Sequence, residues 1–160
     1  ELQGFDVKPS VFEASASEFL SKPDLSDEIF GPTTLLVKAD RKEDLLAIAR
    51  SLEGQLTASV HGDEDDLIEY ADLIAILETK VGRLIFNGFS TGVEVCPSMV
   101  HGGPYPATSD SRSTAVGSRA ITRFARLVCF QNFPDAALPE ELKEENPLSI
   151  WRMTDGEFLK

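Results

Sequence analysis

The sequence contains 160 residues, of which 42% are hydrophobic and 26% are charged, as in an ordinary globular domain with a substantial core. Its 27 acidic residues outnumber its 15 lysines and arginines, and the net charge of -12 disfavours binding to nucleic acid or to an anionic membrane surface. No apolar run approaches the roughly 18 residues of a membrane span, and the two cysteines and two histidines provide neither a disulfide framework nor zinc-ligand spacing. We therefore expect a cytoplasmic chain without a bound metal.

The first predicted elements alternate between strand and helix. Residues 33–39 follow a Gly-Pro turn signal, are rich in leucine and β-branched side chains, and predict a strand. Asp40 is then expected to cap a helix, with Glu43 completing a capping box and Gly54 ending the helix. Residues 56–62 predict a second strand.

An acidic stretch at 63–66 predicts the start of another helix, because carboxylates are favourable at the positive end of the helix dipole. The apolar periodicity extends this helix to about Thr79. It predicts an inward face made of Leu67, Ile68, Ala71, Ile74 and Ala75. Residues 83–87 predict a third strand, and a long loop follows it.

The C-terminal part of the sequence predicts a helix over 114–126, a last strand over 127–133, and a tail with a short acidic helical turn. Alternating strands and helices with short connections favour an α/β fold with a largely parallel, three-layer sheet. The sequence contains neither a dinucleotide-binding G-x-G-x-x-G nor a P-loop, so the α/β pattern alone indicates no chemistry.

The loop after the third predicted strand contains two motifs that are common in catalytic sites, GFSTG at 88–92 and HGG at 101–103. A nucleophilic serine in G-x-S-x-G must turn directly into a helix, and the prolines that follow in this loop prevent one. The HGG motif also follows the serine, whereas hydrolase oxyanion loops of this kind precede it. A serine hydrolase built on Ser90 is therefore disfavoured, and we keep it as an alternative.

A thiol enzyme built on Cys96, which lies in the same loop, is a second alternative. A nucleophilic thiolate needs a basic neighbour or a helix N-terminus to stabilise its charge. Glu94 is negatively charged, like the thiolate, and would disfavour it. The sequence does not place His101 beside the thiol. Cys129 falls in an apolar stretch and is expected to be a small buried side chain.

Three motifs, in order along the chain, resemble those of the aldehyde dehydrogenase superfamily. Residues 27–32, DEIFGP, resemble its E-I/V-F-G-P signature, and residues 82–87, GRLIFN, resemble its G-x-hydrophobic-N strand. Residues 101–104, HGGP, stand where a Pro-Phe-Gly-Gly loop usually lies. The resemblance implies the C-terminal part of an aldehyde dehydrogenase catalytic domain over residues 1–126, followed by an oligomerisation strand and C-terminal tail over residues 127–160.

Within the superfamily, residues 102–131 and 146–156 resemble the NADP-preferring subgroup that oxidises 2,5-dioxopentanoate (α-ketoglutarate semialdehyde) to 2-oxoglutarate. The resemblance implies thiolate attack on the aldehyde, hydride transfer to NADP+ or NAD+, and hydrolysis of the thioester. It implies a small-molecule aldehyde substrate and a homo-oligomeric full-length enzyme, with no nucleic-acid or membrane partner.

In that family the catalytic cysteine, the general-base glutamate and most of the cofactor domain lie N-terminal to the E-I-F-G-P signature. Neither Cys96 nor Cys129 matches the family nucleophile. We therefore expect a fragment that lacks the catalytic Cys and Glu and is inactive alone. A non-catalytic assembly or regulatory domain of the same fold is the alternative.

The resemblance assigns cofactor contacts to Glu28 and Phe30. An ionised carboxylate only accepts hydrogen bonds, which suits Glu28 to the vicinal hydroxyls of the nicotinamide ribose. Phe30 would pack beside the nicotinamide ring. The candidates to line the aldehyde pocket are Asn87, Val95, Cys96, Pro97 and His101. No catalytic residue is assigned within the chain.

Overall fold

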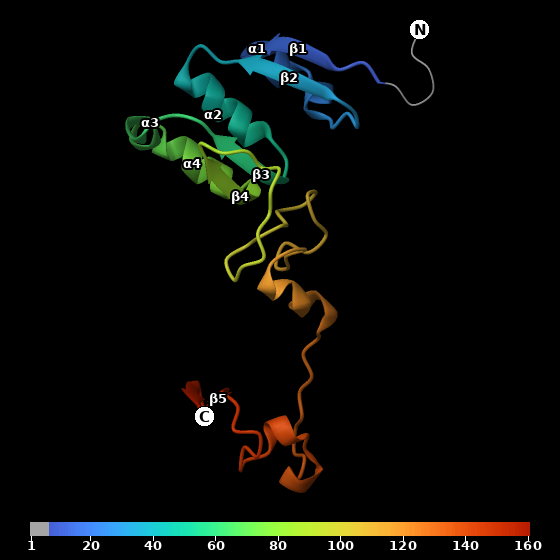
Figure 1. Ribbon diagram of the computed structural model, residues 1–160. Helices are drawn as coiled ribbons and strands as arrows, with labels where there is room; N and C mark the ends of the chain where they lie inside the picture. The colour runs from blue at the N-terminus through green and yellow to red at the C-terminus, as the bar shows by residue number, and fades with distance from the viewer. Residues whose placement is uncertain (1–6) are drawn as a thin grey trace. The chain divides into compact units, whose positions relative to one another are not determined.

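The computed structural model describes residues 7–160 (Figure 1). The chain divides into two compact units, Glu1–Phe124 and Ala125–Lys160. In its described part, the first unit contains two separate parallel strand pairs and the α-helices that cover them. The second unit contains short 3-10 turns and one antiparallel hairpin. Across residues 7–160 we find no helix whose length and apolar character would let it span a bilayer.

The first sheet pairs β1 (Ser10–Ser15) with β2 (Thr33–Lys38) in parallel. Helix α1 (Ala16–Ser21) begins directly after β1, and its first turn is closed by a reciprocal capping box. The Ser15 hydroxyl accepts a hydrogen bond from the backbone N–H of Glu18 at 3.2 Å, and the Glu18 carboxylate accepts one from the backbone N–H of Ser15 at 3.0 Å. These bonds satisfy two N–H groups that would otherwise lack partners, so the turn from strand to helix is locally determined.

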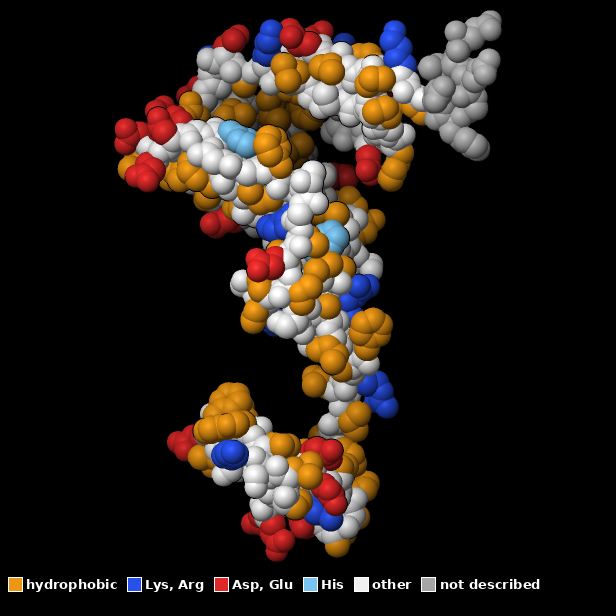
Figure 2. All heavy atoms as spheres, viewed as in Figure 1, with side chains coloured by type: hydrophobic (Ala, Val, Ile, Leu, Met, Phe, Trp, Pro, Cys, Tyr) orange, Lys and Arg blue, Asp and Glu red, His pale blue; other side chains and the backbone are white. Residues whose placement is uncertain are grey.

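The second sheet pairs β3 (Gln55–Val60) with β4 (Val81–Phe86), again in parallel. Helices α2 (Lys42–Ser51) and α4 (Ala71–Glu78) bury their apolar sides against each other and against this sheet. The buried core consists of Leu46, Ala49, Leu73 and Leu77, with partly buried side chains from both strands packed around it. The short helix α3 (Glu64–Glu69) carries three acids in its first turn, and acidic side chains gather over it in Figure 2.

The predicted strands 33–39, 56–62 and 83–87 are confirmed as β2, β3 and β4, and the α/β class with parallel pairing is confirmed with them. The single three-layer sheet is not found, because β2 pairs with β1 instead of joining β3 and β4. Strand β1 and helix α1 are absent from the sequence-based expectation. Each sheet in the described residues therefore has two strands and two open edges.

The first predicted helix forms, but its predicted cap is wrong. Arg41, not Asp40, occupies the N-cap position of α2, and its side chain makes no capping bond. The Arg41 guanidinium instead bonds the Asp44 carboxylate at 2.6 Å, which lowers the pKa of Asp44 through that hydrogen bond. The acids of the first turn still favour this end of the helix through the dipole.

The second predicted helix breaks at Tyr70 into α3 and α4, which shifts its buried face. Leu73 and Leu77 are buried, whereas Ile68, predicted to face inward, is 77% exposed. A continuous helix would keep one phase over its whole length, so an interruption changes which residues face the core. The predicted inward face is therefore wrong.

The C-terminal predictions also change. The helix expected over 114–126 is the 3-10 helix η2 (Ser118–Phe124). Residues 127–133 form no strand: no described segment pairs with them, and Leu127 is fully exposed. Without a partner for its backbone groups, an apolar segment cannot become a strand. The remaining elements are η1 (Pro23–Ser26), η3 (Asp135–Ala137), η4 (Glu140–Leu142) and the hairpin of β5 (Arg152–Thr154) with β6 (Glu157–Leu159).

Candidate functional site

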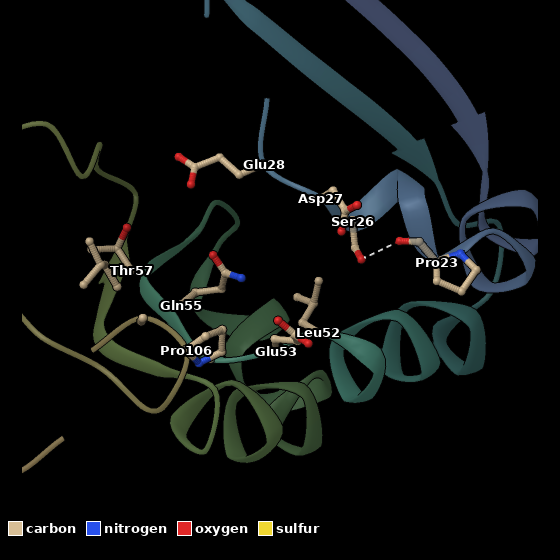
Figure 3. A pocket seen from close by; sticks show the side chains of 12 residues that line it. Pro23, Ser26, Asp27, Glu28, Leu52, Glu53, Gln55, Thr57 and Pro106 are labelled. Atoms are coloured by element: carbon tan, nitrogen blue, oxygen red, sulfur yellow. Dashed lines mark hydrogen bonds between the residues drawn. The ribbon is translucent and has the colours of Figure 1, made fainter. Parts of the chain in front are cut away.

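The first unit contains a cavity of about 720 Å³, with Glu28 on its wall (Figure 3). One side is formed by η1 and the residues that follow it, and the other by the start of β3 and the segment before it. Figure 3 shows Glu28 across the opening from Gln55, Thr57 and Pro106. The cavity therefore joins segments that are distant in the sequence, and it contains the carboxylate that the sequence assigns to cofactor binding.

Both residues assigned to the cofactor are open to contact. Glu28 is exposed, and its carboxylate forms no hydrogen bond or ion pair within the described residues. Phe30, two positions further along, is 91% exposed. A large apolar ring that is almost fully exposed among the described residues is available to pack against a ligand or another segment. The pair thus offers an acceptor group and an aromatic face on one short segment.

Asn87 is placed as an anchor between the two strands of the second sheet. Its side-chain amide accepts a hydrogen bond from the Gly62 N–H at 3.0 Å and donates one to the Gly62 carbonyl at 2.8 Å. Its backbone N–H donates to the carbonyl of Val60 at 2.9 Å, and its φ of 50° lies in the left-handed region that asparagine tolerates. These contacts fix the point where β4 becomes the loop, and none of the described cavities includes Asn87 among its walls.

The other pocket candidates do not converge on one cavity. Val95 is 78% exposed, and the Cys96 thiol lies 3.5 Å from the Ser98 hydroxyl. Pro97 lines a cavity of about 150 Å³, and His101 lines a different one of about 200 Å³. The Nδ1 atom of His101 is buried without a hydrogen-bond partner in the described residues. Within this chain, the candidate residues therefore line different cavities or lie at the surface, and they do not form one pocket.

The HGG motif has a packing role in this fold. A Cβ on Gly82 would overlap the carbonyl oxygen of Gly102, and a Cβ on Gly103 would overlap that of Gln55. The motif therefore runs directly against the first residues of β3 and β4, where only glycine permits such a close backbone approach. This contact explains the glycines without an oxyanion site.

The hydrolase alternatives find no support in the geometry. Ser90 lies in a turn, and no helix follows it before η2 begins at Ser118. Cys129, expected to be buried, is exposed, so that prediction is wrong: its segment forms no strand that could be covered. In the part of the chain that is described, His, Cys, Asp and Glu side chains form no group of three or more that could hold a metal ion.

Arg83 is not among the residues predicted from the sequence, although its side chain bonds three residues of the loop. From β4 its guanidinium donates to the carbonyl of Ser90 and to that of Gly92, each at 2.8 Å. It also lies 3.7 Å from the sulfur of Met99. The available signal is a single charge inside the otherwise apolar strand VGRLIF.

No family model matches the chain. It is 50% identical over 147 residues to alpha-ketoglutaric semialdehyde dehydrogenase 2 of Azospirillum brasilense, covering 92% of the chain and 28% of that protein. It is 49% identical over 151 residues to the alpha-ketoglutaric semialdehyde dehydrogenase of Acinetobacter baylyi, covering 94% and 29% respectively. The protein of that name from Bacillus subtilis is 31% identical over 110 residues, covering 68% of the chain and 20% of the relative. The chain thus spans under a third of these relatives, and the resemblance to a C-terminal part of such enzymes is confirmed.

Proposed function

We propose that this chain, which is similar over nearly its whole length to the C-terminal part of alpha-ketoglutaric semialdehyde dehydrogenases, belongs to an enzyme that oxidises 2,5-dioxopentanoate to 2-oxoglutarate. The observation that carries this proposal is the 50% identity over 147 residues to a protein of that name. The names of the relatives also support it, because they describe dehydrogenases of a small aldehyde, and such enzymes imply a nicotinamide cofactor. NADP+ is the cofactor we propose, with NAD+ as the alternative.

Glu28 and Phe30 fit a nicotinamide cofactor. When bound, the cofactor supplies the hydride acceptor. The Glu28 carboxylate, exposed on the wall of the large cavity and free of partners within residues 7–160, would accept hydrogen bonds from two ribose hydroxyls. The Phe30 ring, exposed beside it, would limit the positions of the nicotinamide ring.

The nucleophile and the general base are proposed to lie outside this chain. The thiolate would attack the aldehyde carbonyl, and water activated by the base would later hydrolyse the thioester. Loop 88–101 would then form part of the aldehyde pocket, with Val95, Cys96, Pro97 and His101 as its candidate lining. The cavities in this chain alone are open to segments that the remainder of the enzyme would supply.

Residues 127–133 are proposed to pair with another subunit of a homo-oligomer. They are mostly apolar and form neither helix nor strand, and Leu127, Val128 and Phe133 are more than half exposed at 100%, 57% and 55%. A segment of this kind gains backbone hydrogen bonds and apolar burial when it adds to a sheet edge. We propose the cytoplasm as its compartment, since both cysteines are free thiols.

The proposed function is tested with the full-length protein that contains this chain. We expect NADP-dependent oxidation of 2,5-dioxopentanoate that is lost when the upstream cysteine is alkylated, and no turnover by the 160-residue chain alone. Glu28→Gln should raise the KM for NADP+ by about tenfold, because a charged acceptor for the ribose hydroxyls is lost. Glu69→Gln, a matched change on the exposed end of α3, should leave KM unchanged.

Two outcomes would overturn parts of this proposal. A full-length protein that binds neither NADP+ nor NAD+ and oxidises no aldehyde would refute the enzyme assignment. An active enzyme in which Glu28→Gln behaves like Glu69→Gln would instead favour an assembly or regulatory role for this chain.

A further inference from the structure

The GFSTG turn has no part in the proposed chemistry, yet its backbone surrounds one side chain. The carbonyls of Ser90 and Gly92 point at the two terminal nitrogens of Arg83, which donate to them at 2.8 Å each. Met99, further along the same loop, places its sulfur 3.7 Å from one of these nitrogens. One guanidinium therefore contacts both the beginning and the later part of loop 88–101.

The chemistry of this contact requires arginine. A guanidinium is planar and rigid, and its two terminal N–H groups can serve two acceptors at once, whereas a lysine ammonium is a point charge on a flexible stem. Arg83 lies on β4, which is paired along its length with β3, so the backbone from which the guanidinium extends is held in place. Its Nε atom is buried and has no hydrogen-bond partner within the described residues.

The loop has other attachments at its ends and one near its middle, where the Cys96 carbonyl accepts a hydrogen bond from the Ser118 N–H at 3.3 Å. Asn87 ties its start to Gly62 through two amide hydrogen bonds. At the far end, the His101 backbone N–H donates to the Thr114 hydroxyl at 2.8 Å. Arg83 supplies the side-chain bonds from the sheet to the backbone of Ser90 and Gly92, so it holds this first part of the loop close to β4.

We propose that Arg83 is a positioning residue for the aldehyde pocket: by holding the carbonyls of Ser90 and Gly92, it sets the conformation of loop 88–101 and thereby the affinity for the aldehyde. This inference rests on the proposed function, in which loop 88–101 forms a wall of that pocket. Arg83 itself touches no reacting atom, so its loss loosens substrate binding more than it slows the chemical step.

The test compares Arg83→Met, Arg83→Lys and Arg83→Ala with Arg50→Met in the full-length enzyme. Arg50 is an exposed arginine in the last turn of α2, away from the loop. We expect Arg83→Met to raise the KM for 2,5-dioxopentanoate by about tenfold while kcat changes by less than about twofold, as for loss of uniform binding. Arg83→Lys should raise this KM less than Arg83→Met, because an ammonium still donates hydrogen bonds but lacks the planar pair of terminal donors of the guanidinium.

Two further readouts separate positioning from general destabilisation. Hydrogen exchange of the peptide covering 88–101 should accelerate in Arg83→Met and not in Arg50→Met, whereas peptides of β3 and β4 should be unchanged. Added methylguanidinium should restore the KM of Arg83→Ala, and methylammonium at the same concentration should not. The KM for NADP+ should be the same in all variants.

The outcomes distinguish the failure of this inference from the failure of the proposed function. If hydrogen exchange in loop 88–101 is unchanged in Arg83→Met, Arg83 does not hold the loop, whether or not the enzyme is active. Faster exchange with an unchanged KM for the aldehyde refutes the link to substrate affinity. If the wild-type protein oxidises no aldehyde, the proposed function fails. The positioning role then fails with it, even if the exchange data show that Arg83 holds the loop.

Discussion

Gly82→Ala tests the close approach between β4 and the HGG motif. The added methyl would overlap the Gly102 carbonyl oxygen and lie 3.1 Å from the Cα of Gly103, so it meets backbone, which cannot rotate away. Overpacking of this kind costs about 1–3 kcal/mol. Replacing glycine also reduces the entropy of the unfolded chain, which returns about 0.4–1 kcal/mol. The difference between these ranges is a net loss of about 0–2.6 kcal/mol in the free energy of unfolding, and we expect a loss near their midpoint, about 1.3 kcal/mol.

The assay is urea denaturation of the full-length protein, followed through the transition that includes this sheet. Gly31→Ala is the matched control, because nothing lies within 4 Å of a Cβ at that position. The control should keep or slightly raise the urea midpoint, since only the unfolded-state term applies. Equal midpoints for Gly82→Ala and Gly31→Ala would show that the HGG backbone does not lie against β4.

Three further predictions concern the first unit. Leu73→Ala should reduce the unfolding free energy by about 2–5 kcal/mol and Ile68→Ala by less than about 0.5, because only the first is buried; equal losses in urea denaturation would contradict the break between α3 and α4. Ser15→Ala should cost about 1 kcal/mol in the same assay through the lost cap of α1, and an unchanged midpoint would refute the capping box. The hydrogen bond from Lys42 lowers the pKa of Asp72 below its ordinary 3.8, so its stabilising effect is present above that pH and is lost as pH falls through the folded value. Asp72→Asn should therefore flatten the stability profile below about pH 4, and an unchanged acid profile would count against this ion pair.

The sequence predicts strands well where burial shapes their composition. Strands β2, β3 and β4 contain leucine and β-branched residues between turn signals, and each forms where expected. Strand β1 lacks such a pattern: Val11 is 73% exposed, Phe12 is 55% exposed, and Ala14 is the strand's buried residue. Its pairing with β2 uses backbone groups, which every residue has, so side-chain periodicity cannot reveal it.

Residues 127–133 show the opposite error. Their composition is that of a strand, and β-propensity measures how well side chains fit a pleated, half-buried surface. That surface needs a partner strand, and the described residues supply none for this segment. Composition therefore indicates what the segment could pair with, whereas pairing itself depends on a neighbour that a single sequence does not specify.

The candidate site depends on resemblance more than on chemistry. A glutamate and a phenylalanine before a Gly-Pro turn are ordinary surface residues by composition, and only the match of 27–32 to a family signature distinguishes them. The structure adds that Glu28 faces a cavity whose other wall comes from Gln55 and Thr57. These segments are distant in the sequence and meet only through tertiary packing, which no local sequence pattern predicts.

The loop with the most suggestive motifs shows why short motifs mislead. A nucleophile elbow needs glycines for a tight turn and a small polar residue at its tip. The HGG segment lies against Gly82 and needs glycine for steric reasons alone, whereas a Cβ on Gly92 would meet nothing within 4 Å. The GFSTG turn presents the carbonyls of Ser90 and Gly92 to Arg83, a role that the backbone of any residue can fill. The residue types of a short motif therefore do not separate a catalytic turn from a structural one. What separates them is the element that follows: an elbow continues as a helix, whereas here Ser90 continues into a loop that the sheet holds by an arginine.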